Sequence, residues 1–319
     1  MVYLLGTVER LSQSIPVIHD PAEAPFLRTI EDHSKQGYDG LTYGETERHG
    51  CMGVRQKGQA WLSVLWVLMA VTLVACVAGP TQTPSSEITG NDGAPMMLVR
   101  QGEFTMGSNR SFAHEQPSHR VTLDAFYMDK YEVTVGQYTK FLEAMSLAAP
   151  PDWNVMNQPS HQNRPVVNIN WWDASLYCRW AGKRLPTEAE WEKAARGTDG
   201  RIYPWGNDPL DRLRANYGKE TWDNHAALVP VGSLEFGQSP YGIYDLAGNA
   251  WEWVSDWYDK DYYEKSPSQN PSGPEQGATK VLRGGSWYAN LGYLKSTYRF
   301  SLAPSSRDSD FGFRCAKTP

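Results

Sequence analysis

The apolar positions of this chain recur with a helical period in three segments. After Thr134, one helical face carries Val135, Tyr138, Phe141, Leu142 and Met145. Gln137 stands three residues after Thr134, which is the spacing of a capping box. A second helix is predicted over residues 173–181, where Gly182 would end it. A third is predicted over residues 188–196, after another capping-box pair.

Short apolar or alternating runs predict strands between these helices. Residues 96–99 and 102–108 are expected to form a first hairpin, and residues 120–128 and 165–170 to form two further strands. Residues 148–163 are rich in Pro and Asn and are expected to form a loop. Beyond the third helix the pattern indicates only loops and short strands. The predicted fold class is α+β, with few helices and much irregular structure.

The N-terminal part carries a different pattern. An apolar run over residues 60–75 follows Arg55 and Lys57. It is shorter than the ~20 residues of a membrane-spanning helix, but it suits the apolar region of a signal peptide. The run ends in Leu-Val-Ala-Cys at residues 73–76, which resembles a bacterial lipoprotein signal in which Cys76 receives lipid.

A signal peptide normally begins a protein, so translation is expected to start at Met52 and residues 1–51 to be a mis-assigned extension. A genuine extension with a single membrane anchor stays open as the alternative. The expected organisation is then a signal peptide over 52–76, a flexible Pro/Thr/Ser/Gly-rich tether over 77–95 and a globular domain over 96–319. The domain would lie outside the cytoplasm, anchored by lipid at a bacterial cell envelope.

Composition excludes one class of partner. The formal net charge is −6, and no run of basic residues forms the footprint that nucleic acid requires. The chain has 13 Trp, 28 Gly and 21 Pro, which indicates a loop-rich fold with aromatic anchors. No nucleic-acid partner is therefore expected.

The stretch over residues 244–253 holds the densest candidate chemistry. Asp245 and Glu252 are separated by Gly248 and Asn249, two residue types that accept the positive φ of a tight turn. Two carboxylates and the carbonyl groups of such a turn are ligands that calcium prefers. The alternative is a Trp-rich core turn whose acids face water.

Five motifs carry a family resemblance. They occupy residues 182–192 (GKRLPTEAEWE), 203–207 (YPWGN), 248–253 (GNAWEW), 283–287 (RGGSW) and 312–315 (GFRC). In this order they resemble the formylglycine-generating enzyme, or sulfatase-modifying factor, family. The resemblance covers the chain from about residue 96 to the C-terminus and implies a C-type-lectin-like fold.

The resemblance implies two structural calcium sites. The first would use Asp245, the carbonyl groups of Gly248 and Ala250, and Glu252. The second would use Asn216, the carbonyl of Tyr217, Asp223 and the carbonyl of His225, which all precede the turn in the sequence.

Copper is where the chain departs from the family. The family's enzymes bind copper through two cysteines placed after the Gly-Gly-Ser motif, because thiolate is the soft ligand that Cu(I) requires. The same spacing from Ser286 falls on Ala289 and Leu294. Copper binding is therefore not expected, nor is conversion of a sulfatase cysteine to formylglycine.

The domain contains two cysteines, Cys178 and Cys315. The resemblance implies that they form a disulfide, because the family pairs a cysteine in the helix before the GKRLP motif with the cysteine of the terminal GFRC motif. The alternative is a pair of buried free thiols.

The resemblance also places a ligand groove after the double glycine. Its expected residues are Trp251, Ser286, Trp287, Tyr288, Asn290 and Tyr293. Aromatic and amide side chains favour binding of an envelope protein, a peptide or a glycan, so the leading hypothesis is a non-catalytic binding or scaffolding lipoprotein. A periplasmic oxidoreductase of the sulfatase-modifying type, with unknown substrate, is the alternative.

Overall fold

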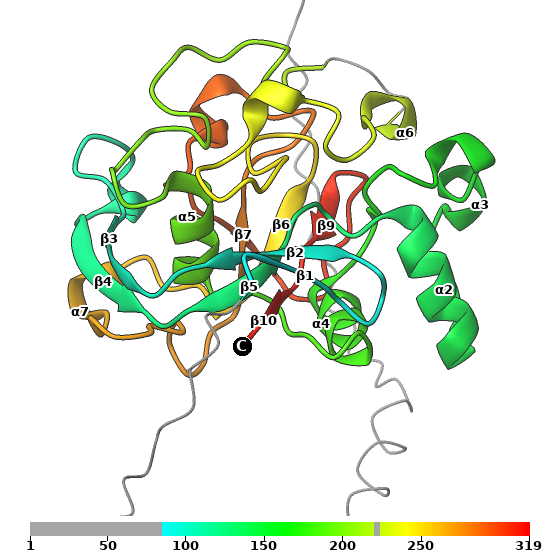
Figure 1. The fold of residues 1–319 in the computed structure, drawn as a ribbon, viewed down its shortest axis with the longest axis horizontal. Helices are drawn as coiled ribbons and strands as arrows, with labels where there is room; N and C mark the ends of the chain where they lie inside the picture. Colours follow the sequence, from blue (N-terminus) through cyan, green and yellow to red (C-terminus); the bar gives the residue numbers. More distant parts are fainter. Residues whose placement is uncertain (1–84, 220–223) are drawn as a thin grey trace, which may run out of the picture. The chain divides into compact units, whose positions relative to one another are not determined.

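The computed structural model describes residues 85–219 and 224–319 (Figure 1). The expected signal peptide and Cys76 lie outside these residues, as does Asp223. Among the described residues, no helix has both the length and the apolar character needed to cross a bilayer.

The first sheet has four antiparallel strands in the order β1-β2-β5-β10. These are β1 (Glu87–Thr89), β2 (Pro95–Val99), β5 (Phe126–Asp129) and β10 (Ala316–Lys317). The boundary predicted at residue 96 is therefore wrong, because the folded domain already includes residues 85–95. Tertiary pairing orders a segment whose composition alone indicated a tether.

A two-stranded ribbon joins β3 (Gly102–Met106) to β4 (His119–Leu123). The hairpin predicted between residues 96–99 and 102–108 is wrong, because β2 pairs with β1 and β5 instead. The single strand predicted over residues 120–128 is divided between β4 and β5, which belong to different sheets.

The third sheet has the order β8-β7-β6-β9. Its strands are β6 (Trp251–Trp257), β7 (Lys280–Arg283), β8 (Phe300–Leu302) and β9 (Phe311–Phe313). β6 pairs antiparallel with β7 and parallel with β9. The Trp-Glu-Trp segment therefore occupies the middle of the sheet.

The three predicted helices are confirmed as α2 (Val135–Met145), α4 (Trp171–Trp180) and α5 (Glu188–Arg196). Capping boxes at Thr134 and Thr187 begin α2 and α5. α4 begins two residues earlier than predicted, because the Asn170 side chain accepts from the backbone N–H of Asp173.

Other local expectations fail. One-turn helices form at α3 (Trp153–Met156), α6 (Asn224–Ala227) and α7 (Tyr262–Lys265). Short 3-10 turns form at Ala113–Glu115, Pro159–His161, Glu235–Gly237 and Leu291–Leu294. Residues 166–169 are buried as expected but form no strand, and Asn168 has a φ of 58°. The class is nevertheless α+β, as predicted.

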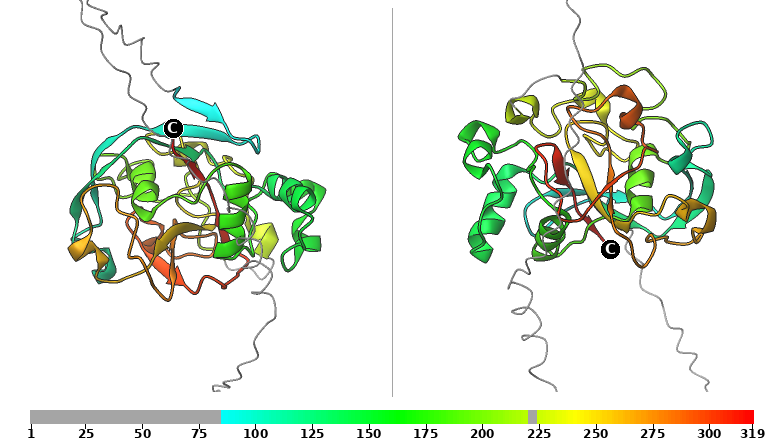
Figure 2. Two further views of the ribbon diagram at one scale, coloured as in Figure 1. Left: turned by 90° about the horizontal axis from the view of Figure 1, so that it is seen from below. Right: turned by 180° about the vertical axis from the view of Figure 1, so that it is seen from behind.

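Helix α5 lies between the β3–β4 ribbon and strands β6 and β7 (Figures 1 and 2). Every one of its residues is buried, including Glu188 and Glu192. Arg283 Nη2 donates to Glu192 at 2.6 Å, and Arg299 donates to both oxygens of Glu188 at 2.7 and 2.9 Å. The helix is therefore tied to the rest of the domain by buried ion pairs as well as by apolar packing.

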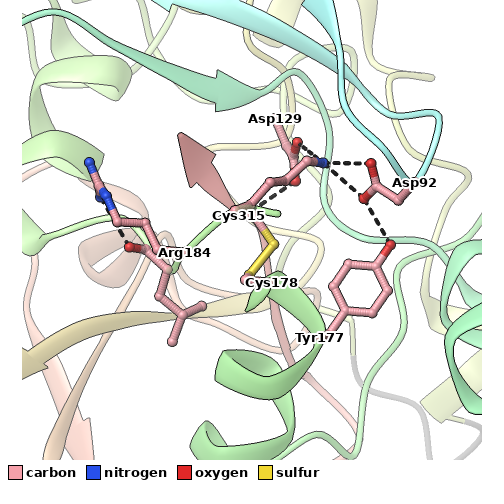
Figure 3. Close-up of a disulfide and its surroundings, with 8 residues drawn as sticks. Asp92, Asp129, Tyr177, Cys178, Arg184 and Cys315 are labelled. Atoms are coloured by element: carbon pink, nitrogen blue, oxygen red, sulfur yellow. Dashed lines mark hydrogen bonds and ion pairs between the residues drawn. A yellow bond between two sulfur atoms is a disulfide. The ribbon is translucent and has the colours of Figure 1, made fainter. Parts of the chain in front are cut away.

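The predicted disulfide between Cys178 and Cys315 is present (Figure 3). It joins α4 to the end of the domain across 137 residues. Closing a loop of this length in the unfolded chain stabilises the fold by about 5 kcal/mol on the chain-entropy account.

A buried lysine lies beside the disulfide. Lys183 Nζ contacts Asp129 Oδ1 at 2.7 Å and both oxygens of Asp92 at 2.7 and 2.8 Å (Figure 3). Tyr177 donates to Asp92, and the backbone N–H of Cys315 donates to Asp129. These contacts explain why the chain around Asp92 is part of the domain.

Candidate functional site

The candidate site begins at the irregular turn before β6. Asp245, Gly248 and Asn249 have φ values of 59°, 86° and 69°. At Gly248 a Cβ would lie 2.2 Å from the carbonyl oxygen of Asn216, so no larger residue fits there. The turn brings Asn216 against Gly248 and Asn249, and the backbone N–H of Asn249 donates to the Asn216 carbonyl at 2.8 Å.

Glu252 forms a buried ion pair. Its carboxylate accepts from Arg314 at 2.7 Å on each oxygen, and Oε2 also accepts from Trp191 Nε1 at 2.7 Å. A carboxylate held this way is already neutralised by a guanidinium. The sequence predicts that Asp245 and Glu252 converge on one ion. In the structure Glu252 instead pairs with Arg314 and so joins β6 to the C-terminal motif.

The carboxylate of Asp245 has fewer hydrogen-bond partners than that of Glu252. Its Oδ2 accepts from the backbone N–H of Gly232 at 2.6 Å, whereas its buried Oδ1 has no hydrogen-bond partner among the described residues. Burial raises the pKa of Asp245 to about 6. One carboxylate oxygen in the turn is thus left without compensation.

Glu132, which the sequence did not reveal, adds a third buried acid. It accepts from the Asn249 side chain at 2.7 Å and from the backbone N–H of Ala250 at 3.0 Å. Burial first, then Asp245 and Glu252, raise its pKa well above the usual value. Asp245, Glu132 and Glu252 are therefore three buried acids that share the positive charge of one guanidinium, that of Arg314.

In the part of the chain that the structure describes, no three His, Cys, Asp or Glu side chains are grouped closely enough to form a metal site by themselves. Any ion at the turn would therefore need backbone carbonyl groups among its ligands.

The second expected calcium site is only partly described. Asn216 donates to the Ala227 carbonyl and to Asn249 Oδ1, both at 3.0 Å. The Tyr217 carbonyl accepts from the Arg212 guanidinium. Asp223 and the side chain of His225 lie outside the described residues, so this site stays a prediction.

The positions expected for copper thiolates lie side by side. A Cβ placed on Gly285 would be 2.7 Å from Leu294 Cδ2 and 3.4 Å from Ala289 Cβ. Ala289 and Leu294 are buried with Ala247, and Tyr203, Trp205, Leu210 and Tyr217 pack against them. The two side chains form a closed apolar cluster beside the double glycine.

The six groove residues divide into two groups. Trp251, Ser286 and Trp287 are buried, and Ser286 Oγ donates to Asp310 Oδ2 at 2.6 Å. Burial raises the pKa of Asp310 to about 6. Tyr288, Asn290 and Tyr293 are exposed. The first group thus belongs to the interior, and only the second can meet a ligand directly.

The exposed groove residues adjoin a surface that the sequence did not predict. Tyr293 contacts the ring of Tyr298 at 4.8 Å between centroids, and Phe112 contacts Tyr298 at 5.4 Å. The side chains with the largest exposed fractions here are Tyr288 at 64%, Leu291 at 57%, Phe112 at 44% and Tyr293 at 37%. We call Phe112, Tyr288, Leu291, Tyr293 and Tyr298 the aromatic face. Phe112 comes from a distant loop, so local sequence carried no signal for it.

Comparison with known proteins shows which family this domain resembles. Residues 81–319 match the family described as sulfatase-modifying factor enzyme 1-like domain. A formylglycine-generating enzyme of Streptomyces coelicolor is 35% identical over 306 residues, covering 78% of this chain and 96% of that protein. Serine/threonine-protein kinase pkn1 of Chlamydia pneumoniae is 37% identical over 241 residues, covering 70% of this chain. The chain spans only 38% of the length of that kinase.

Two solved structures are similar throughout the domain. PvdO from Pseudomonas aeruginosa superposes with a TM-score of 0.62 at 28% identity, covering 74% of this chain and 99% of that one. Treponema denticola variable protein 1 gives a TM-score of 0.61 at 26% identity, covering 74% of this chain and 100% of that one. The family match over residues 81–319 and the identity to the Streptomyces protein show that the chain belongs to the sulfatase-modifying factor enzyme 1-like family.

Proposed function

We propose that this chain is a non-catalytic binding member of its family. The observation that carries the proposal is the closed apolar cluster around Ala289 and Leu294. A methyl group and an isobutyl group offer no electron pair to Cu(I), which prefers thiolate or thioether ligands. Oxidation of a cysteine by oxygen requires a metal or cofactor, because ordinary protein side chains do not supply that redox step.

The aromatic face supplies the binding surface in this proposal. Large aromatic side chains bury much apolar area at a small loss of conformational entropy, and exposed clusters of them mark interaction sites. Asn290 adds an exposed amide in the same segment. An extended peptide or a glycan, each with apolar surfaces and hydrogen-bonding groups, fits this combination.

We place the domain at a bacterial cell envelope, attached through lipid on Cys76. The support is the sequence pattern of residues 55–76. The disulfide agrees with an oxidising compartment.

The expected mature N-terminus is a lipid-modified Cys76. Mass spectrometry of protein purified from its native host tests this. A mature chain that retains residues before Cys76, or a Cys76 without lipid, contradicts the anchor.

The purified domain is expected to bind peptides without oxidising them. It should be incubated with copper, a reductant and a peptide carrying the sulfatase motif, and mass spectrometry should then reveal no aldehyde above the protein-free reaction. The formylglycine-generating enzyme of Streptomyces coelicolor serves as the positive control. Aldehyde formed faster than in the protein-free reaction contradicts the proposal and favours an enzyme.

We also propose that calcium stabilises the turn, held by Asp245 and by the carbonyl groups of Gly248 and Ala250. The uncompensated Asp245 oxygen and the excess of buried acids support this. Calcium at a hundred times its dissociation constant should raise the free energy of unfolding by about 2.7 kcal/mol.

Thermal unfolding with calcium or with a chelator measures the effect. Asp245→Asn should remove the calcium response, because it removes the charged oxygen ligand. Asp261→Asn, which changes only an exposed ion pair with Lys260, should leave the response intact. A wild-type melting temperature that is the same in calcium and in chelator contradicts the proposal.

A further inference from the structure

The structure contains a pocket that includes no residue of the aromatic face or of the apolar cluster. It has a volume of about 420 Å³ and is lined by Trp171, Ser175, Arg179, Arg184, Leu185, Thr187, Ser255 and Lys280. The three α4 residues are spaced by four, so one face of that helix forms a wall of the pocket. This volume is in the range of small-molecule sites.

Lys280 is an unusual residue to find in this wall. It is 4% exposed, and its ammonium lies 4.1 Å from the ring centroid of Trp171 and 3.8 Å from that of Trp257. Its Nζ donates to the Ser255 carbonyl at 2.7 Å. Trp171 is itself fixed, because its Nε1 donates to the Val254 carbonyl at 2.8 Å. The cation is therefore held in place by two aromatic rings and one carbonyl oxygen.

No carboxylate forms an ion pair with Lys280 among the described residues. Asp256 contributes through its field, but it accepts from the backbone N–H of Glu188 and from Ser255 Oγ. Burial lowers the pKa of Lys280 to about 8, against the raising effect of Asp256. A buried ammonium that has no ion-pair partner gains stability when an anion binds in contact with it.

Arg179 provides a second available cation. Its side chain makes no hydrogen bond or ion pair in the described part of the chain, and the residue is exposed. Arg184, by contrast, is engaged by both oxygens of Glu190 at 2.6 and 2.7 Å. Among the described residues, the pocket therefore presents two cations without a carboxylate partner, Lys280 and Arg179, together with the apolar side chains of Trp171 and Leu185.

We propose that this pocket binds a small organic carboxylate with a planar apolar body. Arg179 and Lys280 hold the carboxylate, because a guanidinium fork and a fixed ammonium form charge-assisted hydrogen bonds with it. Trp171 and Leu185 contact the apolar body, and Ser175 offers a hydroxyl group. A monoanion is favoured over a doubly charged phosphate, because a dianion loses more hydration on binding. The apolar rings and one free guanidinium of the pocket can replace few of those hydrogen bonds to water.

Isothermal titration calorimetry with benzoate as the probe tests the proposal. Benzoate should bind saturably at one site, with benzyl alcohol and inorganic phosphate at least about tenfold weaker at matched ionic strength. Absence of saturable benzoate binding, or equal binding of benzyl alcohol, overturns the proposal. Tighter binding of phosphate than of benzoate overturns the carboxylate assignment.

Two variants locate the site. Arg179→Gln should weaken benzoate binding about tenfold. Because Arg179 is exposed, this substitution should not impair folding. Arg110→Gln, a change at another exposed arginine, should leave the affinity unchanged. Lys280→Met should abolish binding, with its melting temperature measured as a check on folding. Unchanged benzoate affinity in Arg179→Gln overturns the assignment to this pocket.

Discussion

The domain depends on a set of buried ion pairs centred on α5 and β6. Glu188 and Glu192 on the helix pair with Arg299 and Arg283, and Glu252 on the strand pairs with Arg314. Removing one partner from such a pair leaves an uncompensated buried charge and typically destabilises a protein by about 3–5 kcal/mol. The pairs therefore specify how distant parts of the chain meet.

The same arginines solve a second problem of a loop-rich fold. Irregular segments leave carbonyl groups without regular partners, and buried carbonyl groups require donors. Arg283 donates to the carbonyl groups of Thr297 and Ser296, and Arg314 donates to that of Tyr244 at 2.8 Å. These ion pairs and hydrogen bonds do not involve the side chains of Ala289, Leu294 or the aromatic face. Cysteines at positions 289 and 294 are therefore not required for this fold.

Sequence was sufficient where the signal was local. The capping boxes and apolar periods of α2 and α5 predicted both helices closely, since each signal lies within the helix it begins. The resemblance predicted the pairing of Cys178 with Cys315 because the motifs that carry them are specific.

Interactions between distant residues were not predictable in this way. Nothing near Asp92 indicates that it contacts Lys183, so the composition of the segment before residue 96 predicts a tether. In the same way, no local pattern around Glu252 indicates that it pairs with Arg314, 62 positions later. Burial of Trp251, Ser286 and Trp287 likewise depends on the third sheet and the loops around it.

A Cu(I) titration against a chromogenic chelator, comparing the wild-type domain with Ala289→Cys/Leu294→Cys, tests the central claim most directly. The two side chains belong to one cluster and both lie next to Gly285, so two thiolates placed there should compete for Cu(I). The account predicts that the double variant removes one equivalent of Cu(I) from the chelator and that the wild-type domain removes none. Removal of a stoichiometric amount by the wild-type domain would contradict it.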